Sequence, residues 1–395
     1  MGKSMLKLSG RILKSNGVSD GIYSVSTQPN IPLVLARKRA YVCKDPTLSN
    51  EISNFNYLII TESNKIILDK LSKNQKYILV SDDFGYIGNL DIVRVINGGT
   101  YFGSVFRASS SHNSFLVTEQ CNHYCLMCSQ PPKKIDDSYL VSEIEHAIPL
   151  IPKDTQEIGF TGGEPTLFGD RFIHLLQLAK NHLPNTSIHI LSNGRTFTNH
   201  DFVTKYANID HHDMMVGIPL YSDDPQLHDY IVQAKGAFDE TIIGILNLKK
   251  LKQKVEIRIV LHKQSIKRLV ELCHFITRNL LFVDHVALMG LEMMGFTRAN
   301  LDKLWIDQFE YKDILSEAIG VLEKSGMNIS IYNHQLCLIN EDVLPYYRKS
   351  ISDWKNEYAK ECQDCNKIDA CGGFFSSGIK HKYSQNLKPF LLETE

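Results

Sequence analysis

Three cysteines within eight residues, Cys121, Cys125 and Cys128, are the side chains of this chain best suited to redox chemistry. They follow directly on the apolar stretch 114–118 with the spacing CxxxCxxC. Three thiolates on one short loop can hold three irons of a [4Fe–4S] cube and leave the fourth iron open, whereas electron-transfer clusters use four cysteines. An open iron can bind and reduce a ligand, so the spacing predicts an iron–sulfur enzyme. The alternative is a structural zinc knuckle that enlists His123, but such sites usually carry a second cysteine pair nearby.

A second motif, Gly162-Gly163-Glu164-Pro165, follows the apolar run 157–161. Read alone, it is equally well a plain turn. After a strand, however, two glycines allow the backbone to approach a ligand closely, and Glu164 would add an anionic acceptor for an ammonium group. The motif therefore predicts part of a binding site.

The C-terminal region carries a second set of cysteines. Cys362, Cys365 and Cys371 have the spacing C-x2-C-x5-C, and Cys337 lies upstream of them. Four thiolates suit either a [4Fe–4S] cluster or a zinc ion. We expect a metal site here, with Cys337 as the fourth ligand because no cysteine follows Cys371.

The elements that must position these motifs alternate regularly between strand and helix. Apolar runs predict strands over residues 115–119, 157–161, 187–191, 214–220, 255–261 and 285–288. Amphipathic stretches between them predict helices over 141–150, 171–182, 238–252 and 267–280. Such alternation implies a parallel sheet with right-handed crossovers, whose ligands bind at the carboxyl ends of the strands. The cysteine loop, the Gly-Gly-Glu-Pro loop and the loop 192–194 should then share one face.

The chain divides into three predicted regions. Residues 1–110 are β-rich and predict a small barrel or sandwich, residues 111–296 form the α/β core, and residues 297–395 form an irregular cysteine-rich extension. The extension includes an expected helix over 305–324 and a short strand over 328–332. The predicted fold class is α/β, a partial (β/α)6 TIM-like barrel flanked by these two regions.

Composition bounds the location and the partners. Hydrophobic content of 43% and charged content of 22% are ordinary for a globular protein. A formal net charge of −1 predicts neither nucleic-acid nor anionic-membrane binding. No stretch approaches the roughly 20 apolar residues of a membrane span, and the first residues lack the apolar run of a signal peptide. The expected location is the reducing cytoplasm, where clustered cysteines bind metals.

With CxxxCxxC after the first strand, GGEP after the second and six βα units, residues 113–295 resemble the radical S-adenosylmethionine (SAM) superfamily. The resemblance implies a [4Fe–4S] cluster whose open iron binds SAM and cleaves it reductively to a 5′-deoxyadenosyl radical. It implies cluster ligation by the three upstream cysteines and binding of the methionine amino end by the Gly-Gly-Glu motif. Arg258 would contact the carboxylate or ribose, with Asn193 in a similar role. Met127 replaces the usual aromatic residue, and its backbone would meet adenine. The loop 219–222 departs from the family pattern.

The C-terminal cysteines resemble the auxiliary-cluster extensions called SPASM or twitch domains. The phrases 114–121, 126–133 and 348–354 are further similar to the C-type radical SAM maturases (HxsC) of the His-Xaa-Ser peptide system. This resemblance implies modification of a ribosomally made peptide with His-Xaa-Ser repeats by oxidation or cross-linking. It also implies a second radical maturase as partner and a reductase such as flavodoxin or ferredoxin. Two alternatives stay open, a radical enzyme acting on a nucleotide or other small molecule and a non-enzymatic metal-binding adaptor.

Overall fold

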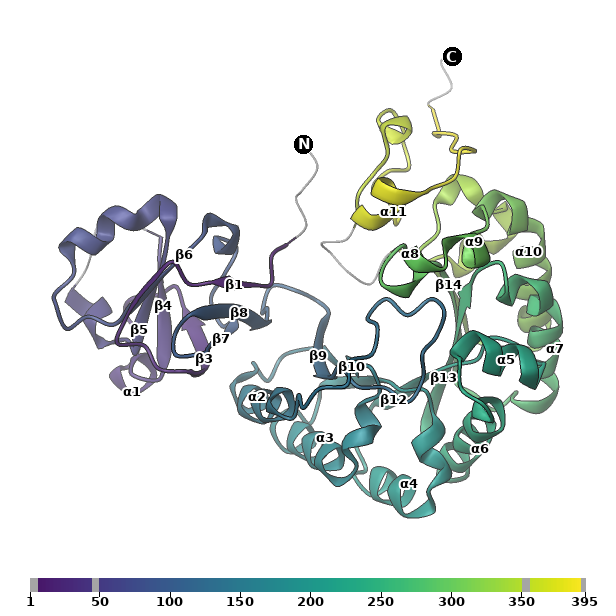
Figure 1. Ribbon diagram of the computed structural model, residues 1–395, viewed down its shortest axis with the longest axis horizontal. Coiled ribbons are helices and arrows are strands. Elements are labelled where there is room, and N and C mark those ends of the chain that lie inside the picture. The colour runs from purple at the N-terminus through teal and green to yellow at the C-terminus, as the bar shows by residue number, and fades with distance from the viewer. Residues whose placement is uncertain (1–5, 45–49, 350–355, 392–395) are drawn as a thin grey trace.

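The computed structural model of the chain describes residues 6–44, 50–349 and 356–391. Its N-terminal part is an eight-stranded mixed sheet in the order β1-β8-β7-β3-β4-β5-β6-β2, with one short helix, α1 (Leu33–Ala36) (Figure 1). The strands are β1 (Ser9–Arg11), β2 (Lys14–Asn16), β3 (Gly21–Ser26), β4 (Arg39–Cys43), β5 (Tyr57–Thr61), β6 (Tyr77–Val80), β7 (Ile92–Ile96) and β8 (Tyr101–Phe106).

This sheet closes into a barrel. Strands β1 and β2 stand at opposite ends of the strand order, yet only Ile12 and Leu13 separate them in the chain. Their backbone amides continue the pairing on both sides, from Ile12 to the carbonyl of Thr100 (2.8 Å) and from Leu13 to that of Leu79 (2.8 Å). The β-rich N-terminal region is therefore a closed barrel whose interior is filled by its own apolar cluster.

Seven parallel strands form the second sheet, in the unbroken order β15-β14-β13-β12-β11-β10-β9. Each strand pairs in parallel with the next, as expected for strands joined by helical crossovers. Their bounds are β9 (Asn113–Thr118), β10 (Glu157–Gly162), β11 (Ser187–Leu191), β12 (Met214–Pro219), β13 (Lys254–Leu261), β14 (His285–Gly290) and β15 (Ile329–Tyr332). The predicted α/β class is confirmed.

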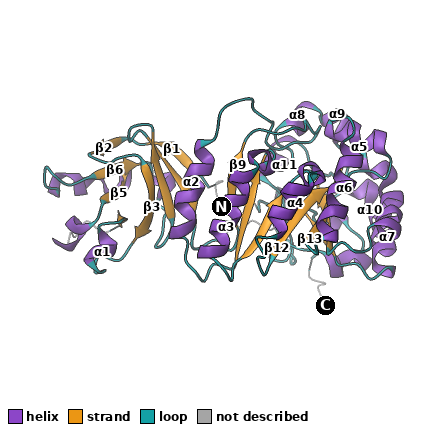
Figure 2. Cartoon of the chain, turned by 90° about the horizontal axis from the view of Figure 1, so that it is seen from below, coloured by secondary structure: helices purple, strands orange, loops and turns teal. Residues whose placement is uncertain are grey.

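Helices cover the convex side of this sheet and leave its concave side to the loops (Figures 1 and 2). Their apolar faces pack on the strands in one continuous core, because the strands are rich in fully buried valine and isoleucine. These helices are α2 (Tyr139–Ala147), α3 (Asp170–His182), α4 (His200–Ala207), α6 (Ala237–Lys250), α7 (Leu269–Asn279) and α10 (Gln308–Lys324). Helix α5 (Pro225–Val232) packs in a separate apolar cluster with Leu126 and Met127 of the cysteine loop.

The sheet has one more strand than the six βα units predicted. Strand β15 lies in the region expected to be the extension, but it pairs with β14 over four residues, from Val286–Ile329 to Met289–Tyr332. Helix α10 makes the crossover between the two strands. The strand is only four residues long, so its sequence gave a weak signal, and pairing with β14 decides its place.

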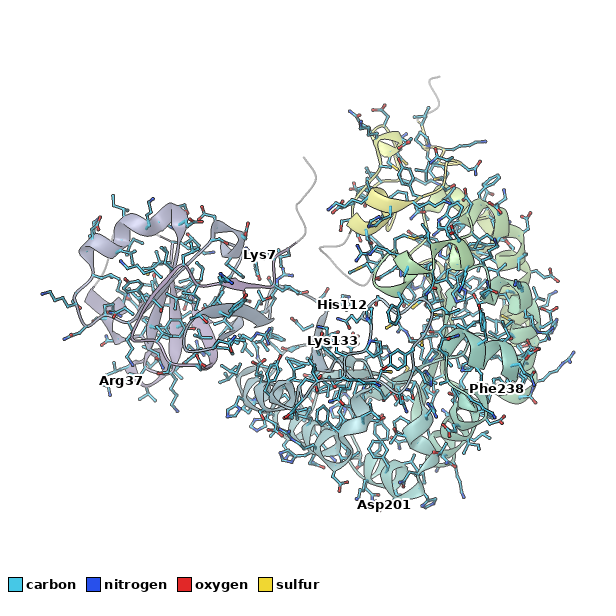
Figure 3. The ribbon with its side chains drawn as sticks, in the orientation of Figure 1. Lys7, Arg37, His112, Lys133, Asp201 and Phe238 are labelled. Carbon is cyan, nitrogen blue, oxygen red and sulfur yellow. The ribbon has the colours of Figure 1, made fainter. Side chains whose placement is uncertain are left out.

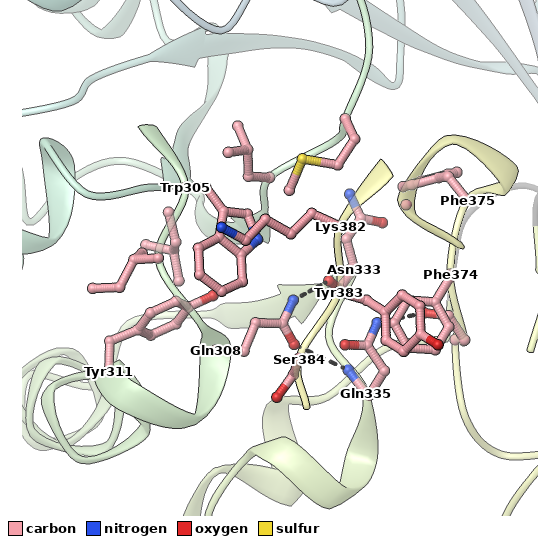
Figure 4. Close-up of a pocket in the computed structure, with 17 residues that line it drawn as sticks. Trp305, Gln308, Tyr311, Asn333, Gln335, Phe374, Phe375, Lys382, Tyr383 and Ser384 are labelled. Carbon is pink, nitrogen blue, oxygen red and sulfur yellow. Dashed lines mark hydrogen bonds between the residues drawn. The ribbon is translucent and has the colours of Figure 1, made fainter. Parts of the chain in front are cut away.

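The C-terminal segment packs against the end of the parallel sheet through side chains from both parts (Figure 4). Gln335 donates to the carbonyl of Gly373 (2.6 Å), and the ammonium of Lys382 lies 3.8 Å from the ring centre of Trp305. Beyond β15, the described residues contain one short α-helix, α11 (Ser376–His381), and short 3-10 turns, and are otherwise irregular, as predicted. Two further short helices, α8 (Phe296–Ala299) and α9 (Leu301–Leu304), lie between β14 and α10.

Candidate functional site

One cavity of about 290 Å³ lies at the carboxyl ends of the parallel strands, and the three upstream thiols line it. Strand residues that line it come from five consecutive strands, namely Thr161, Leu191, Gly217, Arg258 and Met289. Most side chains singled out from the sequence meet here, since the lining also includes Cys121, Cys125, Met127, Cys128, Gly162, Gly163 and Asn193. The parallel sheet thus brings together motifs that are up to 137 residues apart in the chain, from Cys121 to Arg258.

The cysteine loop rests on the end of helix α5. The amide of Tyr124 donates to the carbonyl of Val232 (3.1 Å), and that of Leu126 donates to Ile231 (2.9 Å). After the cysteines the chain returns to the end of β9, where the ammonium of Lys133 contacts the carboxylate of Glu119 at 2.6 Å (Figure 3). Both ends of the loop are therefore fixed to the core, so the three thiols are presented on a supported backbone.

Burial controls the charge of these thiols. It raises the pKa of Cys121 to about 11 and raises the pKa values of Cys125 and Cys128, with neighbouring thiols adding to the shift at Cys125. Near neutral pH the thiols are therefore protonated unless a bound cation replaces the protons. A soft metal centre does this, since it binds thiolates and releases protons. The donor set fits a three-cysteine cluster site.

The two glycines of the Gly-Gly-Glu-Pro motif allow the second loop to touch the first. A Cβ atom at Gly162 would lie 2.3 Å from the carbonyl oxygen of Thr118, and one at Gly163 would lie 2.0 Å from that of Gln120. Without Cβ atoms, the amides of Gly163 and Glu164 donate to these same carbonyls (2.8 Å each). The glycines thus serve first to join the loop to the cysteine loop, in addition to lining the cavity.

The side chain of Glu164 does not lie where the sequence predicted, which was beside an ammonium group in the cavity. Its side chain is fully buried and is absent from the cavity lining among the described residues. The carboxylate accepts hydrogen bonds from Thr166, from the hydroxyl of Ser192 (2.9 Å) and from the amide of Asn193 (2.6 Å). Burial raises its pKa, while these bonds favour the ionised form. In this arrangement Glu164 connects the loop after β10 to the loop after β11 and does not line the cavity.

Asn193 lies at the junction of three loops. Its amide donates to Glu164, its side-chain nitrogen donates to the side-chain oxygen of Asn122 in the cysteine loop (2.6 Å), and its side-chain oxygen accepts from the amide of Arg195 (3.0 Å). The side chain both lines the cavity and orients the cysteine loop.

Arg258 reaches the cavity from strand β13, and a buried carboxylate holds it there. Glu256, which is 4% exposed, accepts from Arg258 (2.7 Å) and lies 2.6 Å from Nδ1 of His285. His189 lies 3.4 Å away on its other side. Burial would raise the pKa of Glu256, but the contacts with His189 and His285 and the charge of Arg258 together hold it well below its usual range. The carboxylate is therefore ionised and fixes the guanidinium.

We expect Glu256→Gln to lower the free energy of unfolding by about 3 kcal/mol at pH 7, because it leaves a buried cation without its partner. A depressed pKa stabilises the fold above the unfolded-state value of about 4.3 and loses that effect as the pH falls below it. The difference between variant and parent should therefore shrink between pH 5 and pH 3.5 in urea unfolding. Glu157→Gln, at a half-exposed carboxylate, should change stability by less than about 0.5 kcal/mol. A difference that stays constant with pH would contradict this account.

Two residues with ring side chains, His123 and Tyr221, also line the cavity. His123 is 2% exposed, its Nδ1 lies 4.0 Å from the sulfur of Cys125, and burial lowers its pKa to about 3, so the ring is neutral. Tyr221 stacks on the ring of His228 at 5.9 Å in the loop that departs from the family pattern. The signal for Tyr221 was present in the sequence as an aromatic residue two positions beyond a strand end.

The four downstream cysteines also share one small cavity. Cys337 sits in a 3-10 turn (Leu336–Leu338) soon after β15, and the loop of Cys362, Cys365 and Cys371 folds back onto it. Burial raises the pKa values of Cys337 and Cys362. The fold therefore brings Cys337 to the other three cysteines in spite of their separation in the sequence. Residues 350–355, most of the 348–354 phrase, lie outside the described residues.

The described residues include neither a ready site for a single metal ion nor a membrane-spanning helix. Across residues 6–44, 50–349 and 356–391, no group of three or more His, Cys, Asp or Glu side chains has the geometry to hold a metal ion. A four-iron cube separates its thiolates more widely than one ion does, so this result concerns sites for single ions. Within the same ranges, no helix combines the length and the apolar character that crossing a bilayer requires.

The central part of the chain matches a known protein family. Residues 115–276 match the family described as the radical SAM superfamily, so this segment is a radical SAM superfamily domain. It begins in β9 and ends in α7, and thus contains both the cysteine loop and the Gly-Gly-Glu-Pro loop. No curated protein sequence matches the chain.

Several solved structures are similar to the chain at low identity. Streptococcus suis SuiB bound to S-adenosylmethionine has 17% identity and a TM-score of 0.45 over 60% of this chain and 49% of SuiB. Native anSMEcpe with bound AdoMet has 14% identity and a TM-score of 0.49 over 71% of this chain and 92% of anSMEcpe. Coproporphyrinogen III oxidase (HemN) from Escherichia coli has 16% identity and a TM-score of 0.43 over 54% of this chain and 53% of HemN. The chain thus spans about half the length of SuiB.

Proposed function

We propose that the chain is a radical SAM enzyme that modifies a ribosomally synthesised peptide bearing His-Xaa-Ser repeats. The observation that carries the enzyme class is that three thiols of one loop line a cavity at the strand ends of a radical SAM superfamily domain. When bound, a [4Fe–4S] cluster with SAM supplies a 5′-deoxyadenosyl radical that abstracts hydrogen from the substrate. The protein's own share is to bind, to orient and to exclude water.

The lining residues divide this work by their chemistry. Gly162 and Gly163 expose backbone polar groups toward the methionine amino end, and the guanidinium of Arg258 meets the carboxylate or the ribose. The backbone of Met127 lies beside the three cysteines and is available to adenine. Tyr221, buried against His228, closes the wall and keeps water from the reactive centre.

The peptide substrate is proposed on the similarity to His-Xaa-Ser maturases, with support from the second cysteine cavity. We assign that cavity to an auxiliary [4Fe–4S] cluster held by Cys337, Cys362, Cys365 and Cys371. Zinc is the alternative, and it would require these thiols to move closer together, because no described group of three or more such side chains is placed to hold a single ion. An auxiliary cluster would accept the electron that leaves the substrate radical or anchor the peptide. A second radical maturase and a reductase such as flavodoxin or ferredoxin complete the proposed system.

The test is anaerobic incubation of the reconstituted protein with dithionite and SAM, followed by chromatography for 5′-deoxyadenosine. Formation of 5′-deoxyadenosine supports the enzyme class, and its absence with a fully loaded cluster refutes it. Adding a peptide with His-Xaa-Ser repeats should then give a product whose mass falls by two hydrogens per oxidation or cross-link. Turnover of a nucleotide or other small molecule in place of the peptide would favour the alternative substrate class.

Metal analysis separates the assignments of the second site. Two cubes give about eight iron and eight sulfide per chain, whereas one cube with zinc gives about four of each and one zinc ion. A protein that holds zinc at both sites and no sulfide would be the structural adaptor.

A further inference from the structure

A segment after β14 holds the cysteine loop by three successive carbonyl groups. The amide of Phe296 donates to the carbonyl of Cys128 (2.8 Å), and the hydroxyl of Thr297 donates to that of Met127 (3.1 Å). The side-chain nitrogen of Asn300 donates to the carbonyl of Leu126 (3.0 Å). The carbonyl groups of residues 126, 127 and 128 are thus all held from outside the loop.

This contact is buried and closely fitted. Thr297 is fully buried, and Leu126 and Met127 are each 7% exposed. Leu304, at the end of α9, belongs to the same apolar cluster as these two loop residues. At Gly295, φ is 52° and a Cβ atom would lie 2.3 Å from the carbonyl oxygen of Cys128. The backbones of the two segments therefore touch, and neither can shift without the other.

The cysteine loop needs such partners. It runs as irregular backbone outside helix and strand, so its carbonyl groups have no ladder to pair with, and buried carbonyls that lack a partner are costly. The three bonds also fix the orientation of each peptide plane from residue 126 to residue 128. That orientation sets the position of the Cys128 sulfur and of the Met127 backbone, which the proposed function places beside the cluster and adenine.

We propose that Thr297 and Asn300 are positioning residues for the cluster, acting through the carbonyls of Met127 and Leu126. The proposal rests on the proposed function, because it presumes a cluster on the upstream cysteines. Neither residue lines the cavity of the three cysteines. They act on the cluster through the cysteine loop and do not contact the cluster themselves.

The test compares Thr297→Val with Thr297→Ser in the reconstituted full chain. Valine keeps the shape and removes the hydroxyl, whereas serine keeps the hydroxyl. We expect release of iron from the upstream site to a ferrous chelator to become about tenfold faster in Thr297→Val, the factor of one lost hydrogen bond to a buried carbonyl. Thr297→Ser should restore the parental rate. The EPR change of the reduced cluster on adding SAM should weaken in Thr297→Val but not in Thr297→Ser.

Thr186→Val is the matched control. Thr186 is also fully buried and donates to a backbone carbonyl, that of Thr155 (2.8 Å), but it precedes β11 at the opposite end of the sheet. It should lose stability without faster iron release. Asn300→Asp, at a half-buried position, removes the donor and should act like Thr297→Val.

Iron release at the parental rate in both Thr297→Val and Asn300→Asp would overturn the proposal, as would equally fast release from Thr186→Val. These outcomes differ from failure of the proposed function, because a parent protein that holds no cluster on the upstream cysteines would show that failure directly.

Discussion

A Cys125→Ala variant is expected to hold no cluster at the upstream site and to form no detectable 5′-deoxyadenosine, a fall of at least about a thousandfold against the parent enzyme. Cys125 lies between the other two cysteines in the loop, and burial raises the pKa of its thiol. Two remaining thiolates cannot hold three corners of a cube, so the variant lacks the centre that reduces SAM. Anaerobic reconstitution, iron analysis and chromatography of the nucleoside products measure both effects.

Cys273→Ala is the control for replacing a buried cysteine by alanine. Cys273 is fully buried in helix α7, in the apolar core on the convex side of the sheet. Its loss should cost about 1 kcal/mol of stability through a small cavity and leave 5′-deoxyadenosine formation intact. If Cys125→Ala still cleaved SAM at a measurable rate with dithionite, the upstream cysteines would not be the reducing centre.

The second large effect is expected for Gly163→Ala. The new Cβ atom would lie 2.0 Å from the carbonyl oxygen of Gln120, so the loop after β10 must move away from the cysteine loop. That movement breaks the bonds from Gly163 to Thr118 and from Glu164 to Gln120. We expect a loss of about 3 kcal/mol of stability and a fall of at least about tenfold in SAM affinity, since 1.4 kcal/mol is tenfold. Urea unfolding and equilibrium dialysis with labelled SAM measure these changes.

Gly320→Ala supplies the comparison. Gly320 lies inside helix α10, and a Cβ atom there would meet no other atom within 4 Å. Alanine should stabilise this helix by up to about 1 kcal/mol and leave SAM affinity unchanged. SAM binding by Gly163→Ala at parental strength would show that the two loops need not touch for the site to form.

The sequence predicted the central fold well because its signals were local. Strand β11 matches the predicted range 187–191, and the other five predicted strands differ by at most two residues at either end. Alternation of buried strands with amphipathic helices is read within a few residues. Helices α4 and α5 were not predicted, because eight residues are too few to show a clear helical period. Strand β15 was weakly predicted, since a four-residue strand is defined chiefly by its partner β14.

At the site, residue types were predictable but their contacts were not. The cysteine spacing carries its meaning within eight residues, so it could be read directly. The role of Glu164 depends on Ser192 and Asn193, which come from another βα unit. The contacts of Thr297 and Asn300 join residues 170 or more positions apart. No local sequence pattern predicts such pairs, because the two residues of each pair come together only when distant elements pack in the complete fold.

Peptide-binding proteins often capture an extended ligand by adding it as a further strand to an exposed sheet edge. The N-terminal barrel offers little such edge within its described residues, because β1 and β2 join its two borders through Ile12 and Leu13, so that only these two three-residue strands keep an unpaired side. A peptide recruited by this region would therefore have to be recognised by side chains on the outer surface. Its affinity should then depend on the side chains of the peptide more than on its backbone, and replacing backbone amides by esters should weaken it little.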